Sequence, residues 1–305
     1  MHPASVPQPM PRQLLGIDWG TSNRRAYVVQ RGGPCLARQA DGAGLLAVQG
    51  AFPAALAVLR ASLGVDSAVP VIMSGMVGSA SGWQEVPYLD TGVALDQLPH
   101  HLVALDGYRN HFIVPGYSTR NPHIDVMRGE ETQLLGIVAH GIRDGWVVLP
   151  GTHSKWVCLD DGRVKQLATY MTGELFAMLG EGGTLASVMA AGGDHSEAFV
   201  DGLNKARLGK PLTHSLFGVR ARVVTQSMAA DQARSFISGL LIGAEFVAAQ
   251  MRAGAAGHTV HLIASGALAA PYTRAAECFG MTAIVHDPDT VYLSALQQFF
   301  AVLDR

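Results

Sequence analysis

The feature that most constrains the fold is a tight turn between two apolar strands in the stretch 14–29 (LLGIDWGTSNRRAYVV). The first apolar run ends at Asp18, and Gly20, Thr21 and Ser22 form the turn before a second strand-like run. This pattern predicts a β-hairpin with donors and one carboxylate at its tip. Glycine lets an anion approach the backbone, and a carboxylate can hold a divalent cation through water. The hairpin indicates phosphate and magnesium chemistry, although similar segments also occur as ordinary turns.

The pattern returns in the stretch 145–159 (GWVVLPGTHSKWVCL), where Gly151 and Thr152 form the turn and a third strand is expected over 163–170. Two hairpins with Gly-Thr tips, one in each half of the chain, predict a duplicated domain with two phosphate loops. A length of 305 residues with 49% apolar residues is sufficient for two domains with complete cores.

The charge and cysteine content of the chain narrow the classes of protein to which it can belong. A net charge of −2 and a pI near 6.6 leave no basic stripe for nucleic acid. Three scattered cysteines are typical of reduced thiols in a cytoplasm. Residues 1–12 read as a flexible extension without a signal-peptide core, and Glu245 interrupts the longest apolar stretch, 236–249. We therefore expect a cytoplasmic protein with no membrane association.

Two segments of the first half carry candidate ligand contacts. A short strand over 70–73 runs into a glycine-rich stretch with Ser79 and Trp83, where backbone and a stacking ring would approach a ligand. A glycine-rich connector with a core tryptophan is the alternative. A helix from Gly129 begins a region of crowded polar groups, namely Asp125, Arg128, Glu130, Glu131 and Gln133. Acids in a first helical turn also serve as plain caps, but this cluster lies just before the second hairpin and indicates a substrate and its base.

The second half continues with a helix that follows Thr172-Gly173-Glu174 and runs through Leu179, and with helices over 194–208 and 231–251, the last with Gly239 and Gly243 spaced for close packing. An apolar strand over 260–265 then ends at Gly266 before another helix. A strand, a glycine and a helix N-terminus in this order commonly bind nucleotide phosphates or adenosine, although any α/β crossover has the same order.

The order of these motifs resembles the actin-like ATPase (ribonuclease H-like) α/β fold, duplicated in two lobes around a nucleotide cleft. More narrowly, the blocks DWGTSNRRAY, MVGSASGWQEVPY, VMRGEETQLLG, LPGTHSKWV, MTGELF and FISGLLIGAE resemble the 2-dehydro-3-deoxygalactonokinase family. The resemblance implies an ATP- and Mg²⁺-dependent kinase that phosphorylates the C6 hydroxyl of 2-dehydro-3-deoxy-D-galactonate in galactonate catabolism. It implies an N-terminal lobe over 13–140 with sugar-acid contacts and a C-terminal lobe over 141–305 with nucleotide contacts. The two lobes would close on their substrates. The resemblance leaves undecided whether the protein forms a homodimer.

Carried over by position, the resemblance implies that Asp18 orients magnesium and that Gly266 borders the adenosine. One phosphate loop would be Gly20, Thr21 and Ser22, and the other Gly151, Thr152 and His153. The second hairpin departs from glycerol-kinase-like enzymes, because Leu149 and Pro150 stand where those enzymes have an acid. A base must come from elsewhere.

The candidates for the base are Glu130, Asp125 and Glu131, the first two ranked equal. Arg128 is the first candidate for gripping the substrate carboxylate, with Arg24 and Lys155 next; Lys155 is equally suited to neutralising the transferred phosphoryl group. Other readings remain: a kinase for another keto-deoxy acid such as the gluconate epimer, a phosphatase, or a nucleotide-switched binding or filament protein of the same fold.

Overall fold

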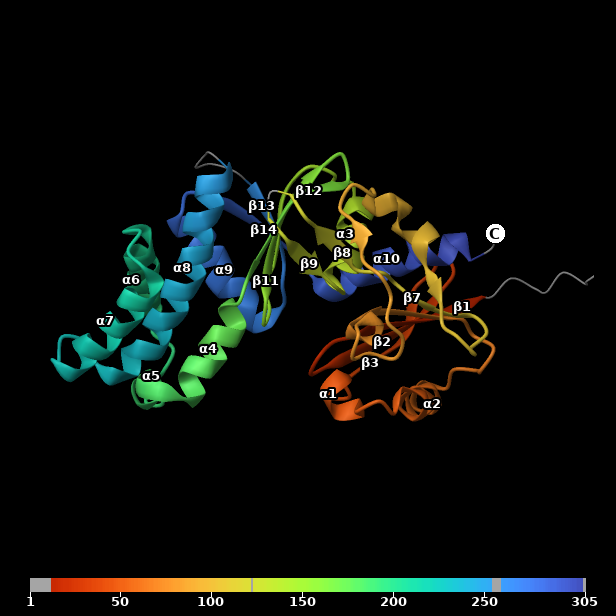
Figure 1. Cartoon of the computed structure of the whole chain (residues 1–305), viewed down its shortest axis with the longest axis horizontal. Helices are drawn as coiled ribbons and strands as arrows, with labels where there is room; N and C mark the ends of the chain where they lie inside the picture. The colour runs from red at the N-terminus through yellow and green to blue at the C-terminus, as the bar shows by residue number, and fades with distance from the viewer. Residues whose placement is uncertain (1–11, 122, 254–258, 304–305) are drawn as a thin grey trace, which may run out of the picture. The chain divides into compact units, whose positions relative to one another are not determined.

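The computed structural model describes residues 12–121, 123–253 and 259–303, which form two compact units (Figure 1). Unit 1 comprises residues up to Asp144, Asp160–Lys165 and the chain from Asp289, whereas unit 2 comprises Gly145–Leu159 and Gln166–Pro288. The predicted extension 1–12 lies outside the described residues except for Arg12. The boundaries of the two units differ from the predicted division at residue 140 mainly because the last helix, α10 (Pro288–Val302), belongs to unit 1.

Unit 1 is built on a six-stranded sheet in the order β3-β2-β1-β4-β7-β6. The predicted first hairpin is present: β1 (Gln13–Trp19) pairs antiparallel with β2 (Arg24–Gln30) and parallel with β4 (Val71–Gly75). The remaining strands are β3 (Cys35–Asp41), β6 (Val103–Ala104) and β7 (His111–Ile113), with β5 (Leu89–Asp90), β8 (Tyr117–Thr119) and β9 (Asp125–Met127) in a second, smaller sheet.

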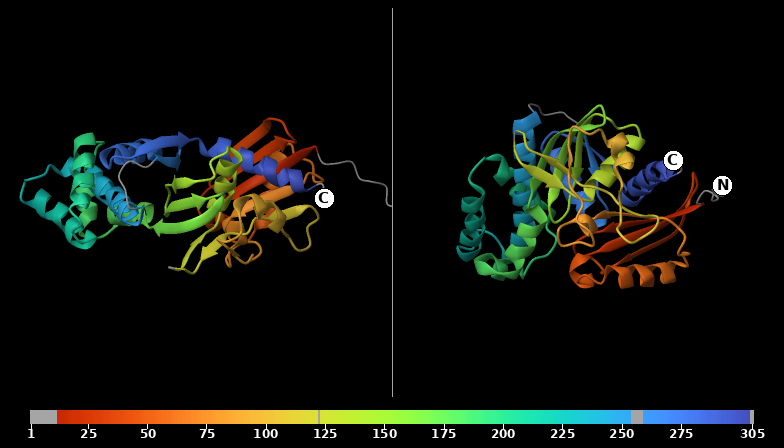
Figure 2. Two further views of the ribbon diagram at one scale, coloured as in Figure 1. Left: turned by 90° about the horizontal axis from the view of Figure 1, so that it is seen from above. Right: turned by 45° about the vertical axis from the view of Figure 1, so that its right-hand side comes forward.

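The two faces of the large sheet pack against different helices, because successive strand residues point to opposite sides. Leu15 and Ile17 belong to the core that α2 (Phe52–Leu63) completes. On the other face, a Cβ on Gly16 would lie 2.3 Å from Leu296 of α10. This is the reason that the C-terminal helix belongs to unit 1, and Figure 2 shows α2 and α10 on opposite sides of the strands.

Unit 2 repeats the plan of unit 1. Its sheet has the order β12-β11-β10-β13-β14, in which β10 (Gly145–Leu149) pairs antiparallel with β11 (Ser154–Asp160) and parallel with β13 (Thr259–Ile263). In unit 1 the hairpin strand β1 lies beside the parallel strand β4, which in turn lies beside the parallel strand β7. In unit 2 the hairpin strand β10 lies beside β13 and then β14 (Thr282–His286) in the same way. The duplication predicted from the two Gly-Thr turns is therefore present in the sheet topology.

Helices cover the sheet of unit 2 and extend away from it (Figure 1). They are α4 (Thr172–Glu181), α5 (Gly183–Met189), α6 (Ser196–Arg207), α7 (Leu212–Val224), α8 (Ala233–Ala253) and α9 (Gly266–Cys278). The predicted glycine packing is present, because a Cβ on Gly239 of α8 would lie 2.0 Å from the carbonyl oxygen of Phe199 on α6. Across the described parts of the chain, we find no helix with the length and apolarity needed to span a bilayer.

Candidate active site

Asp18 stands at the carboxyl end of β1, where the cross-strand register places it opposite Arg25 of β2. Its Oδ2 accepts hydrogen bonds from the Arg25 guanidinium, with Nη2 at 2.6 Å. The Asp18 side chain is 17% exposed and that of Arg25 is 37% exposed, so the carboxylate is the better shielded of the two groups. Arg25 was not among the candidates from the sequence, although the hairpin pattern contains it.

Two glycines approach the second carboxylate oxygen of Asp18. Gly75 ends β4 with a φ of +89°, and a Cβ there would lie 3.4 Å from Asp18 Oδ1 and 2.6 Å from the Trp19 carbonyl oxygen. Gly129 has a φ of +111°, and its Cβ would lie 3.2 Å from the Cα of Gly75 and 3.9 Å from Oδ1. Both positions require glycine for conformation and for space. The segment that begins α3 is thereby brought against the end of β1.

The helix α3 (Glu130–Ala139) begins directly after Gly129. Glu130 is partly exposed, and its Oε2 accepts the backbone N–H of Arg128 at 3.0 Å. Glu131 is completely buried, and both of its carboxylate oxygens lie within 2.9 Å of the Gly129 nitrogen. Burial, followed by the neighbouring Glu130, raises the pKa of Glu131 to about 8. Glu131 therefore holds the Gly129 backbone, whereas Glu130 is the acid at this helix start with access to solvent.

Asp125, the other candidate base, lies in β9 of the small sheet, opposite Thr119. Its Oδ1 accepts the N–H of Val126 at 2.7 Å, and the residue is partly exposed. Three residues lie between Asp125 and Gly129, whereas Glu130 directly follows Gly129, the residue that approaches Asp18.

Arg128 carries an incomplete set of hydrogen bonds. Its Nη2 donates to the carbonyl oxygen of Val86 at 2.7 Å, and its guanidinium lies 4.2 Å from the centre of the Tyr88 ring. Nε and Nη1 are buried and have no hydrogen-bond partner among the described residues. A Cβ on Gly78 would lie 2.8 Å from Nη1, so this glycine makes room for the guanidinium. Buried N–H groups without partners are costly, and a bound carboxylate would satisfy them.

Arg24, the alternative to Arg128, is only 3% exposed and is already held within unit 1. Its Nε and Nη2 form a bidentate pair with Asp41, at 3.2 and 2.8 Å, and Nη1 donates to the carbonyl oxygen of Ala55. These contacts give Arg24 a structural role, in contrast to the substrate contact expected from the sequence. The sequence pattern did not reveal its partner, because Asp41 ends a different strand.

Ser79 and Trp83 stabilise the glycine-rich segment after β4. Ser79 Oγ donates to the carbonyl oxygen of Met76 at 2.7 Å. The Trp83 ring stacks on Phe52 at 5.7 Å and meets Trp19 edge-on at 6.4 Å. Trp83 thus belongs to the core of unit 1, which is the alternative that the sequence left open.

In unit 2, the turn of Gly151, Thr152 and His153 packs against the start of α4. The N–H of Glu174 donates to the Thr152 carbonyl oxygen at 2.9 Å, and its Oε2 lies 2.5 Å from His153 Nε2. A Cβ on Gly173 would lie 2.4 Å from the Gly151 carbonyl oxygen, so glycine is required for this contact. The side chains of Thr152 and His153 are exposed, which leaves the turn accessible to a ligand.

Two further features of unit 2 border this turn. Lys155 lies opposite the buried Leu149 in the hairpin register, and its Nζ donates to Thr169 Oγ1 at 2.9 Å. Gly266 begins α9 after the strand β13, which is parallel to β10, and a Cβ there would meet nothing within 4 Å. The carboxyl ends of neighbouring parallel strands share one edge of a sheet, so the turn and the open N-terminus of α9 lie at that edge.

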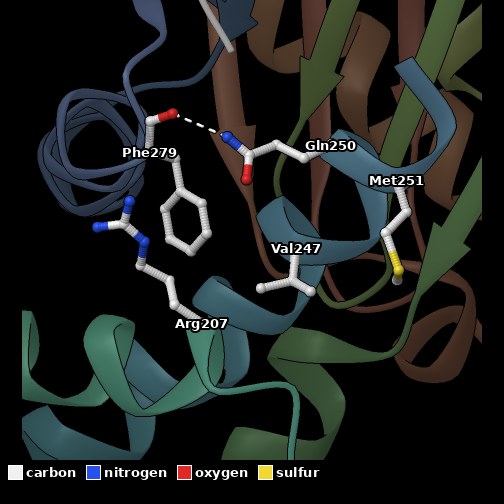
Figure 3. A pocket seen from close by; sticks show the side chains of 5 residues that line it. All are labelled: Arg207, Val247, Gln250, Met251 and Phe279. Atoms are coloured by element: carbon white, nitrogen blue, oxygen red, sulfur yellow. Dashed lines mark hydrogen bonds between the residues drawn. The ribbon is translucent and has the colours of Figure 1, made fainter. Parts of the chain in front are cut away.

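A pocket of about 290 Å³ in unit 2 lies elsewhere (Figure 3). It is lined by Arg207, Val247, Gln250, Met251 and Phe279, with Gln250 Nε2 donating to the Phe279 carbonyl oxygen. Phe279 caps the C-terminus of α9, which is about 20 Å from Gly266 along a 13-residue helix. The pocket is therefore separate from the turn of Gly151, Thr152 and His153.

The donor set around Asp18 is compatible with magnesium. Among the residues that the structure describes, no group of three or more His, Cys, Asp or Glu side chains could hold a metal ion. Mg²⁺ is nevertheless commonly bound through one or two carboxylates together with substrate phosphates and waters. Asp18 offers Oδ1, for which no hydrogen bond is found among the described residues, beside two glycines that leave room for such a ligand.

Comparison with known proteins identifies the family. The profile of the 2-keto-3-deoxy-galactonokinase family matches residues 18–299. A probable 2-dehydro-3-deoxygalactonokinase, DgoK1, of Rhizobium meliloti (strain 1021) is 38% identical, covering 92% of this chain and 94% of that protein. The 2-dehydro-3-deoxygalactonokinase of Escherichia coli (strain K12) is 33% identical over 94% of this chain and 97% of its own.

A solved structure agrees with these relatives. A crystal structure from Sinorhizobium meliloti that carries the 2-dehydro-3-deoxygalactonokinase name superposes with a TM-score of 0.87 at 35% identity, covering 94% of this chain and 95% of that chain. The duplicated sheets are those of the actin-like ATPase fold, as predicted from the two hairpins. The family profile, the two relatives and the fold agree, and the chain belongs to the 2-keto-3-deoxy-galactonokinase family.

Proposed function

We propose that this protein is an ATP-dependent kinase that phosphorylates the C6 hydroxyl of 2-dehydro-3-deoxy-D-galactonate, giving 2-dehydro-3-deoxy-6-phosphogalactonate in galactonate catabolism. Family membership supports the reaction class. The observation that carries the substrate class is Arg128, whose buried Nε and Nη1 have no hydrogen-bond partner among the described residues. A sugar acid has a carboxylate that can satisfy these N–H groups, whereas a neutral sugar has none.

In this proposal unit 1 binds the sugar acid and supplies the base. Arg128 binds the carboxylate, and Glu130 takes the proton from the attacking hydroxyl. Glu130 is favoured over Asp125 because it adjoins Gly129, which lies against Gly75 and Asp18. Glu131 fixes the Gly129 backbone through its buried carboxyl group.

Asp18 would hold Mg²⁺, with Arg25 orienting its carboxylate. When bound, the ion neutralises negative charge on the transferred phosphoryl group and its neighbours. The turn of Gly20, Thr21 and Ser22 begins two residues after Asp18 and presents small residues with donors to the phosphates.

Unit 2 binds ATP in the proposal. Gly151, Thr152 and His153 contact phosphates through an exposed turn, and the open start of α9 at Gly266 borders the adenosine. Lys155 adds positive charge on the strand that follows the turn. We also place the protein in the cytoplasm, which its three cysteines without disulfide support, and light scattering of the purified protein tests a homodimer.

The deciding assay follows ATP consumption with magnesium and compares 2-dehydro-3-deoxy-galactonate, its gluconate epimer and no acceptor. Turnover that depends on the galactonate compound supports the proposal. Equal turnover of both epimers would retain the kinase and remove the substrate preference. Turnover without acceptor would instead indicate a phosphatase or a nucleotide switch.

Arg128→Lys tests the carboxylate contact. Lysine keeps the charge but loses the planar guanidinium, so the KM for the sugar acid should rise about tenfold or more while the KM for ATP changes little. Arg38→Lys is the matched control, because Arg38 is exposed and pairs with Asp289 on the surface. An unchanged sugar-acid KM in Arg128→Lys would remove this residue from the substrate site.

Glu130→Gln and Asp125→Asn separate the two candidate bases. Loss of the base should lower kcat by about 10² to 10⁴ while the substrates still bind. The variant of the other residue should stay within about tenfold of wild type. A large loss in Asp125→Asn alone would transfer the role to Asp125.

A further inference from the structure

Glu245 is a buried acid in an otherwise apolar segment of α8. Its side chain is almost inaccessible, since the residue is 1% exposed. Oε2 accepts hydrogen bonds from Ser154 Oγ and Trp156 Nε1, each at 2.7 Å, and Oε1 accepts one from the Tyr272 hydroxyl, also at 2.7 Å. Thr172 provides a further side-chain hydrogen bond.

A buried carboxyl group is costly unless its acceptor sites are filled, and here donors from several elements fill them. Burial raises the pKa of Glu245, and its hydrogen bonds counteract that rise only in part. The surrounding core is otherwise apolar and includes Phe246 and Phe279. An apolar side chain would fit such surroundings at lower desolvation cost, so the acid calls for an explanation beyond packing.

The donors lie on the elements that form the phosphate turn and its borders. Ser154 directly follows His153 and is the first residue of β11. Thr172 is the first residue of α4, the helix that donates the Glu174 N–H to the Thr152 carbonyl oxygen. Glu245 therefore holds both the strand that leaves the turn and the helix that packs on it.

The third element is α9, whose N-terminus at Gly266 shares a sheet edge with the turn. Tyr272 lies six residues into this helix, about 9 Å along its axis from Gly266. Through the Tyr272 hydroxyl, the same carboxyl group that holds Ser154 also holds α9. One side chain thus links the two features that unit 2 offers to a nucleotide.

We propose that Glu245 is a positioning residue for the nucleoside triphosphate, fixing the Gly151–His153 turn relative to the N-terminus of α9. It does not touch the ligand and acts through Ser154, Thr172 and Tyr272. The inference rests on the proposed function in one respect, namely that unit 2 binds ATP. It assigns a nucleotide-affinity role to a residue outside the phosphate turn.

The test compares Glu245→Gln with Phe246→Leu, each in the whole 305-residue chain. Glutamine keeps the shape of the side chain but replaces one acceptor oxygen with an N–H donor. Because the surrounding groups are hydroxyl and indole donors to Glu245, the variant loses hydrogen bonds of the network. Phe246→Leu removes packing from the same core on the adjacent residue, including the ring contacts with Trp156 and Tyr272, but leaves Glu245 and all of its hydrogen-bond donors in place. Both variants are measured well below their melting temperatures, with the folded fraction established by circular dichroism.

The Kd for ATP, measured by calorimetry, should rise about tenfold or more in Glu245→Gln and less than about twofold in Phe246→Leu. The KM for the sugar acid should change less than about twofold in both. Equal ATP affinity in folded Glu245→Gln and wild type would overturn the inference and leave Glu245 a structural residue. An equal rise in both variants would also overturn it, because loosened packing alone would then explain the effect.

Tyr272→Phe provides a second test if Glu245→Gln does not fold. This variant removes one hydroxyl and should raise the Kd for ATP a few-fold, whereas an unchanged Kd would overturn the inference. Binding and turnover keep the two proposals distinguishable. If wild type binds ATP but shows no acceptor-dependent turnover, the kinase proposal fails while the binding comparison still decides the role of Glu245; absence of ATP binding overturns both.

Discussion

The two hairpins share a backbone plan but stabilise their turns with different chemistry. The first residue of the second strand is buried in both, Arg24 in unit 1 and Ser154 in unit 2. Arg24 forms a bidentate ion pair with Asp41, whereas Ser154 donates to the buried carboxyl group of Glu245. The duplicated topology therefore requires a polar anchor behind each turn without fixing which residue types provide it.

The face opposite these anchors also differs between the hairpins. Before the first turn, Asp18 faces Arg25; at the corresponding register of the second hairpin, Leu149 faces Lys155. Unit 1 thus places an acid opposite a cation in the hairpin register, whereas unit 2 places the aliphatic Leu149 opposite Lys155. The difference fits a metal-binding role for the first hairpin and a phosphate-binding role for the second.

A helix start supports each turn in the same manner, that of α1 (Leu45–Val48) in unit 1 and that of α4 in unit 2. The N–H of Leu46 donates to the Thr21 carbonyl oxygen, as the N–H of Glu174 does to that of Thr152. A Cβ on Gly44 or Gly173 would lie within about 2.4 Å of the turn backbone. The backbone contacts have been kept in both hairpins, and the side-chain chemistry has diverged.

The largest expected effect comes from exchanging the side chain before each turn. Asp18→Asn should lower kcat by about 10³, since an amide holds Mg²⁺ more weakly and leaves Arg25 without its counter-charge. Leu149→Met at the corresponding register should stay within about threefold, because volume-conserving apolar exchanges are tolerated. Steady-state kinetics over a range of Mg²⁺ concentrations measures both. Equal losses would show that the two hairpins do not divide these roles.

The anchors should differ in stability. Arg24→Met leaves Asp41 with hydrogen bonds from Gln39 and Ala43 but without its cation. The variant should cost about 3 kcal/mol, at the lower end for buried ion pairs, because the Asp41 side chain is 28% exposed. Ser154→Ala removes one of several donors to Glu245 and should cost about 1 kcal/mol. Urea unfolding monitored by circular dichroism gives both values. A larger loss in Ser154→Ala would reverse this ranking of the anchors.

Asp41 and Glu245, the acids that pair with the anchors Arg24 and Ser154, should contribute to stability with opposite pH dependence. Burial opposes the ionised form of Asp41, but the hydrogen bonds of Arg24 and others prevail and lower its pKa below the ordinary 3.8. Asp41 therefore contributes stability above that pH, which is lost as the pH falls further. Burial raises the pKa of Glu245 above the ordinary 4.5, so its contribution is lost as the pH rises from that value.

Unfolding midpoints of wild type, Asp41→Asn and Glu245→Gln across pH 2.5–8 test these signs. Relative to wild type, Asp41→Asn should lose less stability in acid, and Glu245→Gln should lose less as the pH rises above 4.5. If the unfolding midpoints of all three proteins changed with pH in parallel, the opposite pH dependence of Asp41 and Glu245 would be contradicted.

The smallest effect is expected at the exposed pair of the second turn. His153 and Glu174 are 49% and 36% exposed in their side chains, so His153→Gln should change stability by less than about 0.5 kcal/mol. The KM for ATP should still rise a few-fold, because the turn loses one of its side-chain contacts. Thermal melts and ATP kinetics separate the two results. A stability loss above 1 kcal/mol would make the pair structural, as the buried anchors are.

Much of the fold could be predicted from local patterns. The first hairpin, the long helix α8 and the glycine contact of Gly239 follow from alternation, helical periodicity and the space that glycine leaves. The repeated Gly-Thr turn predicted the duplicated sheet, which the strand orders confirm. These features depend on residues that are close in sequence or on a motif that recurs.

The candidate site was less accessible to such reasoning. The sequence pattern predicts a substrate contact for Arg24 and none for Arg25, but the hairpin register turns Arg25 toward Asp18 and Arg24 toward Asp41. Glu245 was noted only as a break in an apolar segment, and its partner Ser154 is 91 residues away. An unexpected charge in an apolar run was the available signal.

The sequence by itself determined where strands, turns and helices form and which residues carry reactive groups, because backbone preferences and side-chain periodicity act over a few residues. Only the tertiary structure decided which polar groups are satisfied: Arg24 by Asp41, Glu245 by three elements, and Arg128 in part. Burial makes an unpaired polar group costly, and both burial and pairing depend on strands and helices far apart in the chain.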